Sequence, residues 1–160
     1  MKITTTIILA AFCLLMGACS NNTNLSNNIN TKASFPDSFK FSPAGLKVIT
    51  SSINKKQGTM STLYGNPLAL KKSIGLNKEV VAGEEFTLVT WQQQPDAHWF
   101  GANIPGDLQS VEVLKTIANG ETVAVNYHQY QGKNLVLNTD TLHQGERIKY
   151  IFDQRPSVMP

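Results

Sequence analysis

The stretch that decides the fold is Glu85-Phe86-Thr87-Leu88-Val89-Thr90-Trp91. In an extended chain successive side chains point to opposite faces, so Phe86 and Leu88 share one face and Thr90 continues the same row. A second stretch, Thr59-Met60-Ser61-Thr62-Leu63-Tyr64, alternates apolar and hydroxyl-bearing residues with the same period of two. This period is typical of half-buried strands, and both stretches therefore predict strands of one sheet.

Further strands are predicted from short runs of β-branched and aromatic residues, at 46–50, 110–117, 122–130, 135–137 and 148–152. The dipeptide Asn119-Gly120 favours a tight turn, so the strands on either side of it are expected to form a hairpin. The polar segment Asn54–Gly58 contains glycine and suits a second hairpin loop.

One helix is predicted after residue 66. Asn66 is a good N-cap, Pro67 suits the first helical position, and Leu68-Ala69-Leu70-Lys71-Lys72 are good helix formers. Gly75 lies where a helix of about two turns would end. The predicted fold class is therefore α+β: a predominantly antiparallel β-sheet with one or more short helices, in a single domain.

The N-terminal residues predict a bacterial lipoprotein signal. Lys2 precedes an apolar run, Ile7–Met16, and the small residues Gly17 and Ala18 lead directly to Cys19. A charged start, an apolar centre and small residues at the cut are the layout of a secretory signal. The run is shorter than the roughly 20 apolar residues that a spanning helix needs. We expect residues 1–18 to be removed and Cys19 to carry lipid; the alternative is an ordinary secretory signal cleaved near a cysteine.

Residues 19–34 are rich in asparagine and serine and contain few large apolar side chains. Such a segment buries too little surface to offset the entropy of ordering, so we expect a flexible tether before a domain at 35–160. Lipid on Cys19 would make the membrane a partner. Ser20 is not the aspartate that commonly holds such proteins at an inner membrane, which favours the outer membrane, facing the periplasm.

Composition excludes several function classes. The chain has 2 cysteines, and Cys13 lies in the predicted signal, so the mature chain has no internal disulfide, thiolate zinc site or cysteine nucleophile. Its net charge of +3 becomes +2 without Lys2, and the basic residues are scattered, which argues against nucleic acid as a partner. The sequence also lacks a serine-hydrolase elbow, a phosphate loop and a dinucleotide fingerprint.

The densest group of chemistry-bearing side chains comprises Trp91, Asp96, His98, Trp99 and Phe100. Asp96 and His98 are two residues apart, so in an extended segment the carboxylate could orient the imidazole and raise its basicity. One interpretation is a ligand pocket walled by the three aromatic residues, with His98 as donor, base or axial haem ligand. The alternative, which we favour, is that the aromatics are core and His98 lies at a turn, bonded to backbone. His128 and His143 are expected at the surface, and the spacing of the three histidines matches no local metal motif.

Several segments together resemble the cytochrome P-460 domain family. The matching stretches are Phe35-Pro36, Gly58–Asn66 with Ala69, Gly83–Trp91, Asp96–Ala102 and Ser110-Val111-Glu112. The resemblance covers residues 35–132 and depends on the order of these stretches and on their local sequence. It implies a sheet-rich periplasmic domain that often forms homodimers, with enzymes that oxidise hydroxylamine or detoxify nitrogen oxides at a c-type haem cross-linked to a lysine.

The chain departs from that family at its chemical centre. It has no cysteine-x-x-cysteine-histidine motif, and residues 79–114 contain no lysine that could reach a haem. We therefore expect a membrane-anchored lipoprotein whose domain is a non-enzymatic binding or accessory module, with no certain cofactor. The alternative is a haem-dependent oxidoreductase that holds haem non-covalently through His98 and acts on small nitrogen compounds. A homodimer is compatible with either.

Overall fold

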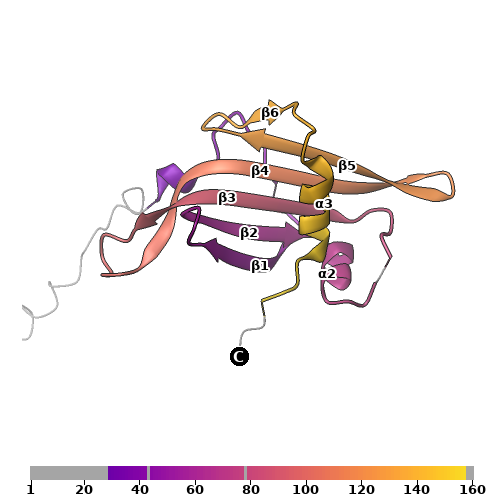
Figure 1. Cartoon of the computed structure of the whole chain (residues 1–160), viewed down its shortest axis with the longest axis horizontal. Coiled ribbons are helices and arrows are strands. Elements are labelled where there is room, and N and C mark those ends of the chain that lie inside the picture. The colour runs from indigo at the N-terminus through magenta and orange to yellow at the C-terminus, as the bar shows by residue number, and fades with distance from the viewer. Residues whose placement is uncertain (1–28, 43, 78, 158–160) are drawn as a thin grey trace, which may run out of the picture.

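Six antiparallel strands form a single sheet in which each strand pairs with its neighbours in the chain, in the order β1-β2-β3-β4-β5-β6 (Figure 1). The strands are β1 (Lys47–Asn54), β2 (Thr59–Gly65), β3 (Glu85–Pro95), β4 (Asn103–Asn119), β5 (Thr122–Gln131) and β6 (Val136–Asn138). The fold class predicted from the sequence is confirmed: one domain, mainly antiparallel sheet, with short helices. The alternation in Glu85–Trp91 is that of β3, one of the two central strands, which pairs with β2 and β4.

The computed structural model describes residues 29–42, 44–77 and 79–157. The predicted signal at residues 1–18, Cys19 and the first part of the predicted tether lie outside these residues. In the described part of the chain, no helix is both long enough and apolar enough to cross a membrane.

Helix α2 (Pro67–Ser73) begins as predicted. The Asn66 side chain accepts a hydrogen bond from the Ala69 backbone N–H at 3.0 Å, and Pro67 occupies the first turn. At the other end, Gly75 has a φ of 81°, the left-handed conformation that glycine adopts without steric cost.

A second helix, α3 (Gln144–Asp153), corrects the prediction of a closing strand at 148–152. Its apolar residues Ile148, Ile151 and Phe152 recur at intervals of three and four, which is the period of a helix face. Ile151 is fully buried against the sheet, with Ile148 and Phe152 packed beside it. The sheet therefore ends at β6, and α3 covers part of one of its faces (Figure 1).

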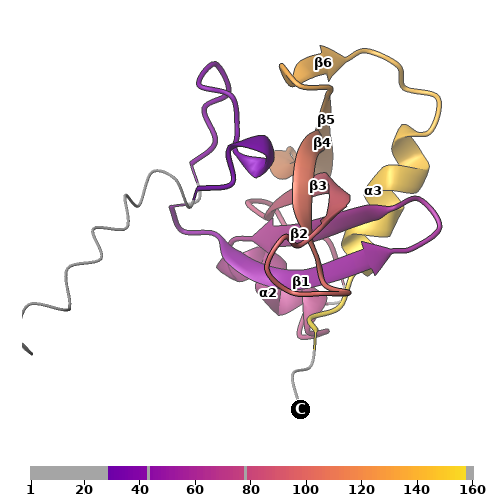
Figure 2. The same ribbon diagram turned by 90° about the vertical axis from the view of Figure 1, so that its left-hand side faces the viewer.

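The two faces of the sheet carry separate hydrophobic clusters. On the helical face, Leu63, Phe86, Leu88 and Leu114 pack under α2 and α3. On the opposite face, Val89, Leu108 and Val111 are buried, and the N-terminal segment covers them with Phe35 and Phe39. Figure 2 shows this segment and α3 on opposite sides of the sheet.

The meander topology places three hairpin turns at one end of the sheet. The β1–β2, β3–β4 and β5–β6 connections share that end, because each strand reverses direction (Figure 1). The N-terminal segment reaches the same end, where a 3₁₀ turn, η2 (Thr31–Ala33), contacts β4. The Asn30 side-chain amide donates to the Pro105 carbonyl at 2.6 Å, so contacts with the sheet begin before Phe35.

Candidate functional site

Asp96 and His98 lie together in the turn between β3 and β4. The Asp96 carboxylate accepts hydrogen bonds from the backbone N–H groups of His98, at 2.7 Å, and Trp99, at 3.3 Å. The His98 imidazole Nδ1 lies 3.5 Å from the same carboxylate oxygen, but its side chain is 88% exposed. The aspartate therefore holds the backbone of a turn, and the imidazole extends into solvent.

The three aromatic residues of the predicted pocket do not come together. Trp91 is half-buried in the cluster beneath the N-terminal segment, and its indole N–H donates to the Ala33 carbonyl at 2.9 Å. Trp99 and Phe100 project from the β3–β4 turn, and their exposed fractions are 72% and 108%. Trp91 is thus core material, as the favoured interpretation holds, whereas the other two belong to the surface.

The surroundings of His98 do not fit a haem. An axial histidine needs apolar walls that enclose the porphyrin and exclude water from it. Here the imidazole and the neighbouring Trp99 and Phe100 side chains are all exposed on one turn. A porphyrin on His98 would be left largely in water, so the residues of this turn do not fit a haem.

A hollow with aromatic walls does exist, on the sheet face that the N-terminal segment covers. Its volume is about 410 Å³, within the size range of small-molecule sites. The segment supplies one wall, the strands β3, β4 and β5 supply the floor and the other wall, and the lining residues are Phe39, Lys40, Phe41, Ser42, Glu85, Thr87, Val113, Lys115, Asn126, His128 and Tyr130. We call this the arm hollow.

The aromatic walls of the arm hollow are braced by one another. Phe39 packs edge-on against Tyr130 with ring centroids 5.0 Å apart, and Phe35 stacks on Phe41 at 4.9 Å. Phe41 also meets Tyr64 edge-on at 6.0 Å. Such contacts hold the rings in fixed orientations, so the walls are formed before any ligand arrives.

The rim of the arm hollow is basic. The Lys115 ammonium lies 2.9 Å from the Glu85 carboxylate, which neutralises its charge. The exposed Lys40 adds a second ammonium at the rim. The His128 ring lies 6.4 Å from the Tyr130 ring, on the same side of β5. With apolar walls and the Lys40 ammonium in addition to the Lys115–Glu85 pair, the hollow suits a small planar ligand that carries a negative charge.

A different polar network joins α3 to the sheet on the helical face. Arg147 donates to both oxygens of the fully buried Glu112 carboxylate, at 2.6 and 2.9 Å, and the Tyr127 hydroxyl donates to it at 2.6 Å. Burial, together with the hydrogen bond to Glu112, raises the pKa of Tyr127 far above its usual range. The hydrogen bond to Glu112 likewise raises the pKa of Arg147. All three groups satisfy one another, as a structural ion pair requires.

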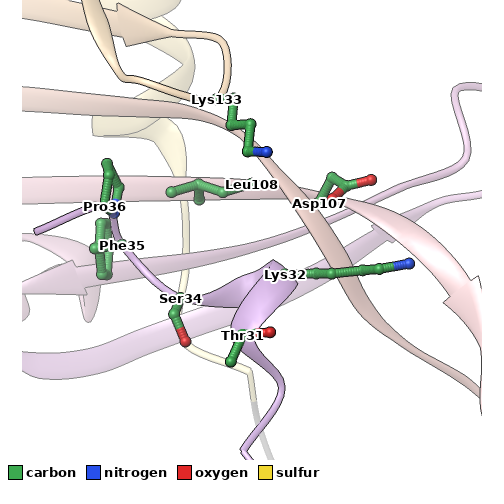
Figure 3. Close-up of a pocket in the computed structure, with 8 residues that line it drawn as sticks. All are labelled: Thr31, Lys32, Ser34, Phe35, Pro36, Asp107, Leu108 and Lys133. Carbon is green, nitrogen blue, oxygen red and sulfur yellow. The ribbon is translucent and has the colours of Figure 1, made fainter.

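A second hollow, of about 640 Å³, lies at the hairpin-turn end of the sheet. Phe35, Pro36 and Leu108 form its apolar side, and Lys32, Lys133 and Asp107 its charged side (Figure 3). Its charged side chains come from three different elements: Lys32 from η2, Asp107 from β4 and Lys133 from the β5–β6 turn.

The arm hollow has no local signal in the sequence. Its aromatic walls come from Phe39 and Phe41 in the N-terminal segment and from Tyr130 in β5, which is far from them in the chain. The sequence predicts a strand at Tyr130 and assigns no role to Phe39 or Phe41. The described residues contain no group of three or more histidine, cysteine, aspartate or glutamate side chains placed to hold a metal ion. No protein-family model matches the chain, and a search of curated proteins finds no match.

Proposed function

We propose that this chain is a lipoprotein of the bacterial cell envelope, anchored through Cys19, whose domain is a non-enzymatic binding module for a small planar anion. The proposal places the domain on the periplasmic side of the outer membrane. From the resemblance to cytochrome P-460 domains we carry over the fold but not the haem chemistry. A homodimer is compatible with it.

The observation that carries the proposal is the arm hollow. Phe39, Phe41 and Tyr130 offer flat apolar surface, and Lys40 and Lys115 lie at the rim. Apolar walls supply most of the binding energy of such sites, and a few polar groups fix the orientation of the ligand. The arrangement supports binding of an aromatic carboxylate or a similar planar anion.

Calorimetric titration of the full chain with 2-naphthoate tests the binding function. We expect saturable binding that Lys40→Gln weakens about five-fold, because loss of one partly exposed charge contact costs about 1 kcal/mol. Tyr130→Leu should weaken it further through loss of aromatic surface. Lys71→Gln, on α2 at the other face, is the matched control and should bind as wild type. An absence of saturable binding at two temperatures, or equal affinity in the Lys40 and Lys71 variants, would refute the proposed site.

The anchor is tested separately by cell fractionation. Wild-type chain should be found with membranes, and Cys19→Ala should be released into the soluble envelope fraction. Several acyl chains on one cysteine hold a protein stably, whereas one chain binds only marginally. Membrane association that survives the substitution would show that the lipid at Cys19 is not the anchor.

A further inference from the structure

We propose that the hairpin-turn end of the domain lies against the lipid bilayer, with Trp99 and Phe100 in the membrane interface. By this end we mean the turns at 54–59, 95–103 and 131–136 together with the N-terminal segment 29–34. The inference rests on the proposed anchor at Cys19 and deepens it, because it states which surface of the domain the membrane contacts.

The first observation is the pair of exposed aromatic side chains. Trp99 is 72% and Phe100 108% exposed, although large aromatic residues usually pack into a core. They sit on a turn whose backbone is held in place. The Asp96 N–H donates to the Ala102 carbonyl at 2.9 Å, and the Ala102 N–H donates to the Trp99 carbonyl at 3.1 Å. The turn thus presents both rings outward, and aromatic residues of this kind are enriched at membrane–water interfaces.

The second observation is the path of the chain toward Cys19. Asn30 donates to the Pro105 carbonyl at 2.6 Å, and Pro105 pairs with Gln93 at the base of the hairpin that carries Trp99. The Ala33 carbonyl accepts from Trp91 on the same hairpin. The chain therefore enters the domain beside this hairpin. The ten peptide links between Cys19 and Ile29 span at most about 35 Å, so the lipid cannot lie far from this end.

The third observation is charge. Four exposed lysines belong to this end: Lys32, Lys55, Lys56 and Lys133. Two aspartates accompany them, Asp96 in the aromatic turn and Asp107 in the hollow that Lys32 and Lys133 also line (Figure 3). Four positive and two negative side chains leave a net charge of +2. A basic surface around exposed aromatic rings complements an anionic phospholipid surface.

The three observations point to lipid as the occupant. A protein partner could use the aromatic rings, but it would not explain why the rings, the lysines and the chain leading to the anchor share one end. A bilayer accounts for all of them, because the anchor brings this end to the headgroups and the turn then reaches the interface.

Fluorescence quenching in vesicles tests the orientation of the anchored chain. The full lipidated chain is reconstituted into phosphatidylethanolamine–phosphatidylglycerol vesicles, with and without dibrominated phosphatidylcholine. We expect brominated lipid to quench the tryptophan emission of wild-type chain by at least a third. The Trp99→Phe chain retains only Trp91, which is half-buried away from the turn tip, and should be quenched little. Equal emission with and without bromine, in chain that floats with the vesicles, would overturn the orientation and leave the anchor standing.

Vesicle sedimentation of the Cys19→Ala chain tests the same surface without its anchor. We expect weak binding to phosphatidylglycerol vesicles that the double variant Trp99→Ser/Phe100→Ser reduces at least ten-fold. The control is Ile117→Ser, which removes an exposed apolar side chain from β4 near the opposite end of the sheet. Because all three side chains are exposed, none of these substitutions should affect folding. Equal losses of binding in the double variant and in Ile117→Ser would overturn the inference. If the chain bound phosphatidylcholine vesicles as well as phosphatidylglycerol vesicles, the lysines would have no role in the binding.

Discussion

The guanidinium of Arg147 and the carboxylate of Glu112 form a two-point ion pair that joins α3 to the centre of the sheet. The Nη2–Oε1 distance is 2.6 Å and the Nε–Oε2 distance is 2.9 Å. The Glu112 side chain is 1% exposed, whereas that of Arg147 is 36% exposed. The carboxylate thus depends on Arg147 and on the hydroxyl of Tyr127 to offset the loss of water.

Removing the arginine should therefore destabilise the domain strongly. We expect Arg147→Met to lower the free energy of unfolding by about 3–5 kcal/mol, because it leaves Glu112 buried without its cation. Urea denaturation measures this. The matched control is Lys149→Met on the same helix, where the Lys149–Asp153 pair is exposed and screened by solvent, so this variant should unfold close to wild type.

The double variant Arg147→Met/Glu112→Leu separates the two causes of the loss. With no charge left to bury, it should be more stable than Arg147→Met alone. If the single and double variants unfold at the same urea concentration, the loss of stability comes from lost packing of the arginine methylenes and not from the unpaired Glu112 carboxylate.

Tyr127 should make the domain sensitive to alkaline pH. Burial and the hydrogen bond to Glu112 raise the pKa of Tyr127, whereas an unfolded tyrosine has a pKa of about 10. Above that pH the unfolded chain loses the proton first, so the free energy of unfolding falls as pH rises. Burial also raises the pKa of Tyr64, which adds to the fall.

Tyr127→Phe should reduce this alkaline slope by one proton, as measured by urea denaturation from pH 8 to pH 11. The variant should also be less stable at neutral pH, because it loses a hydrogen bond to a charged group, worth about 1.5–3 kcal/mol. Equal slopes for wild type and variant would show that another group governs the alkaline transition.

The strands and α2 could be predicted because their signals are local. Alternation in Glu85–Trp91 follows from the geometry of an extended chain, and the Asn66–Pro67 start of α2 follows from capping chemistry. The segment 148–152 has apolar residues that suit a strand as well as a helix. Its helical state is decided by packing of Ile151 on the sheet and by the ion pair between Arg147 and Glu112, both long-range contacts.

The candidate site could not be predicted for the same reason. Phe39 and Tyr130 are neighbours only because the N-terminal segment folds back across β5, and neither residue carries a local motif. The residues that looked chemical, Asp96 and His98, are instead explained by a local requirement, the hydrogen bonding of a turn. The stretch of sequence with the most reactive side chains is therefore a turn, whereas the arm hollow is formed by contacts between residues that are distant in the chain.

Gly65 at the end of β2 should tolerate no side chain. A Cβ there would lie 2.5 Å from the Ile49 Cδ1 and 2.8 Å from the Ala69 Cβ, which is overpacking between β1 and α2. We expect Gly65→Ala to lower the free energy of unfolding by about 1–3 kcal/mol. The control is Gly145→Ala in α3, where a Cβ would meet nothing within 4 Å. That change should stabilise by up to about 1 kcal/mol, so thermal unfolding should shift in opposite directions in the two variants.

Haemin titration distinguishes a binding module from the alternative haem protein. Because the His98 side chain is 88% exposed and its aromatic neighbours are exposed with it, we expect added haemin to keep the absorption spectrum of free haemin in the same detergent. His98→Ala should give the same spectrum as wild type. A saturable Soret shift in wild type that is lost in His98→Ala would establish a haem site on this turn and contradict the assignment of the turn to the membrane. A shift that persists in His98→Ala would direct attention to His128, the histidine that lines the arm hollow, and His128→Ala would then be the deciding variant.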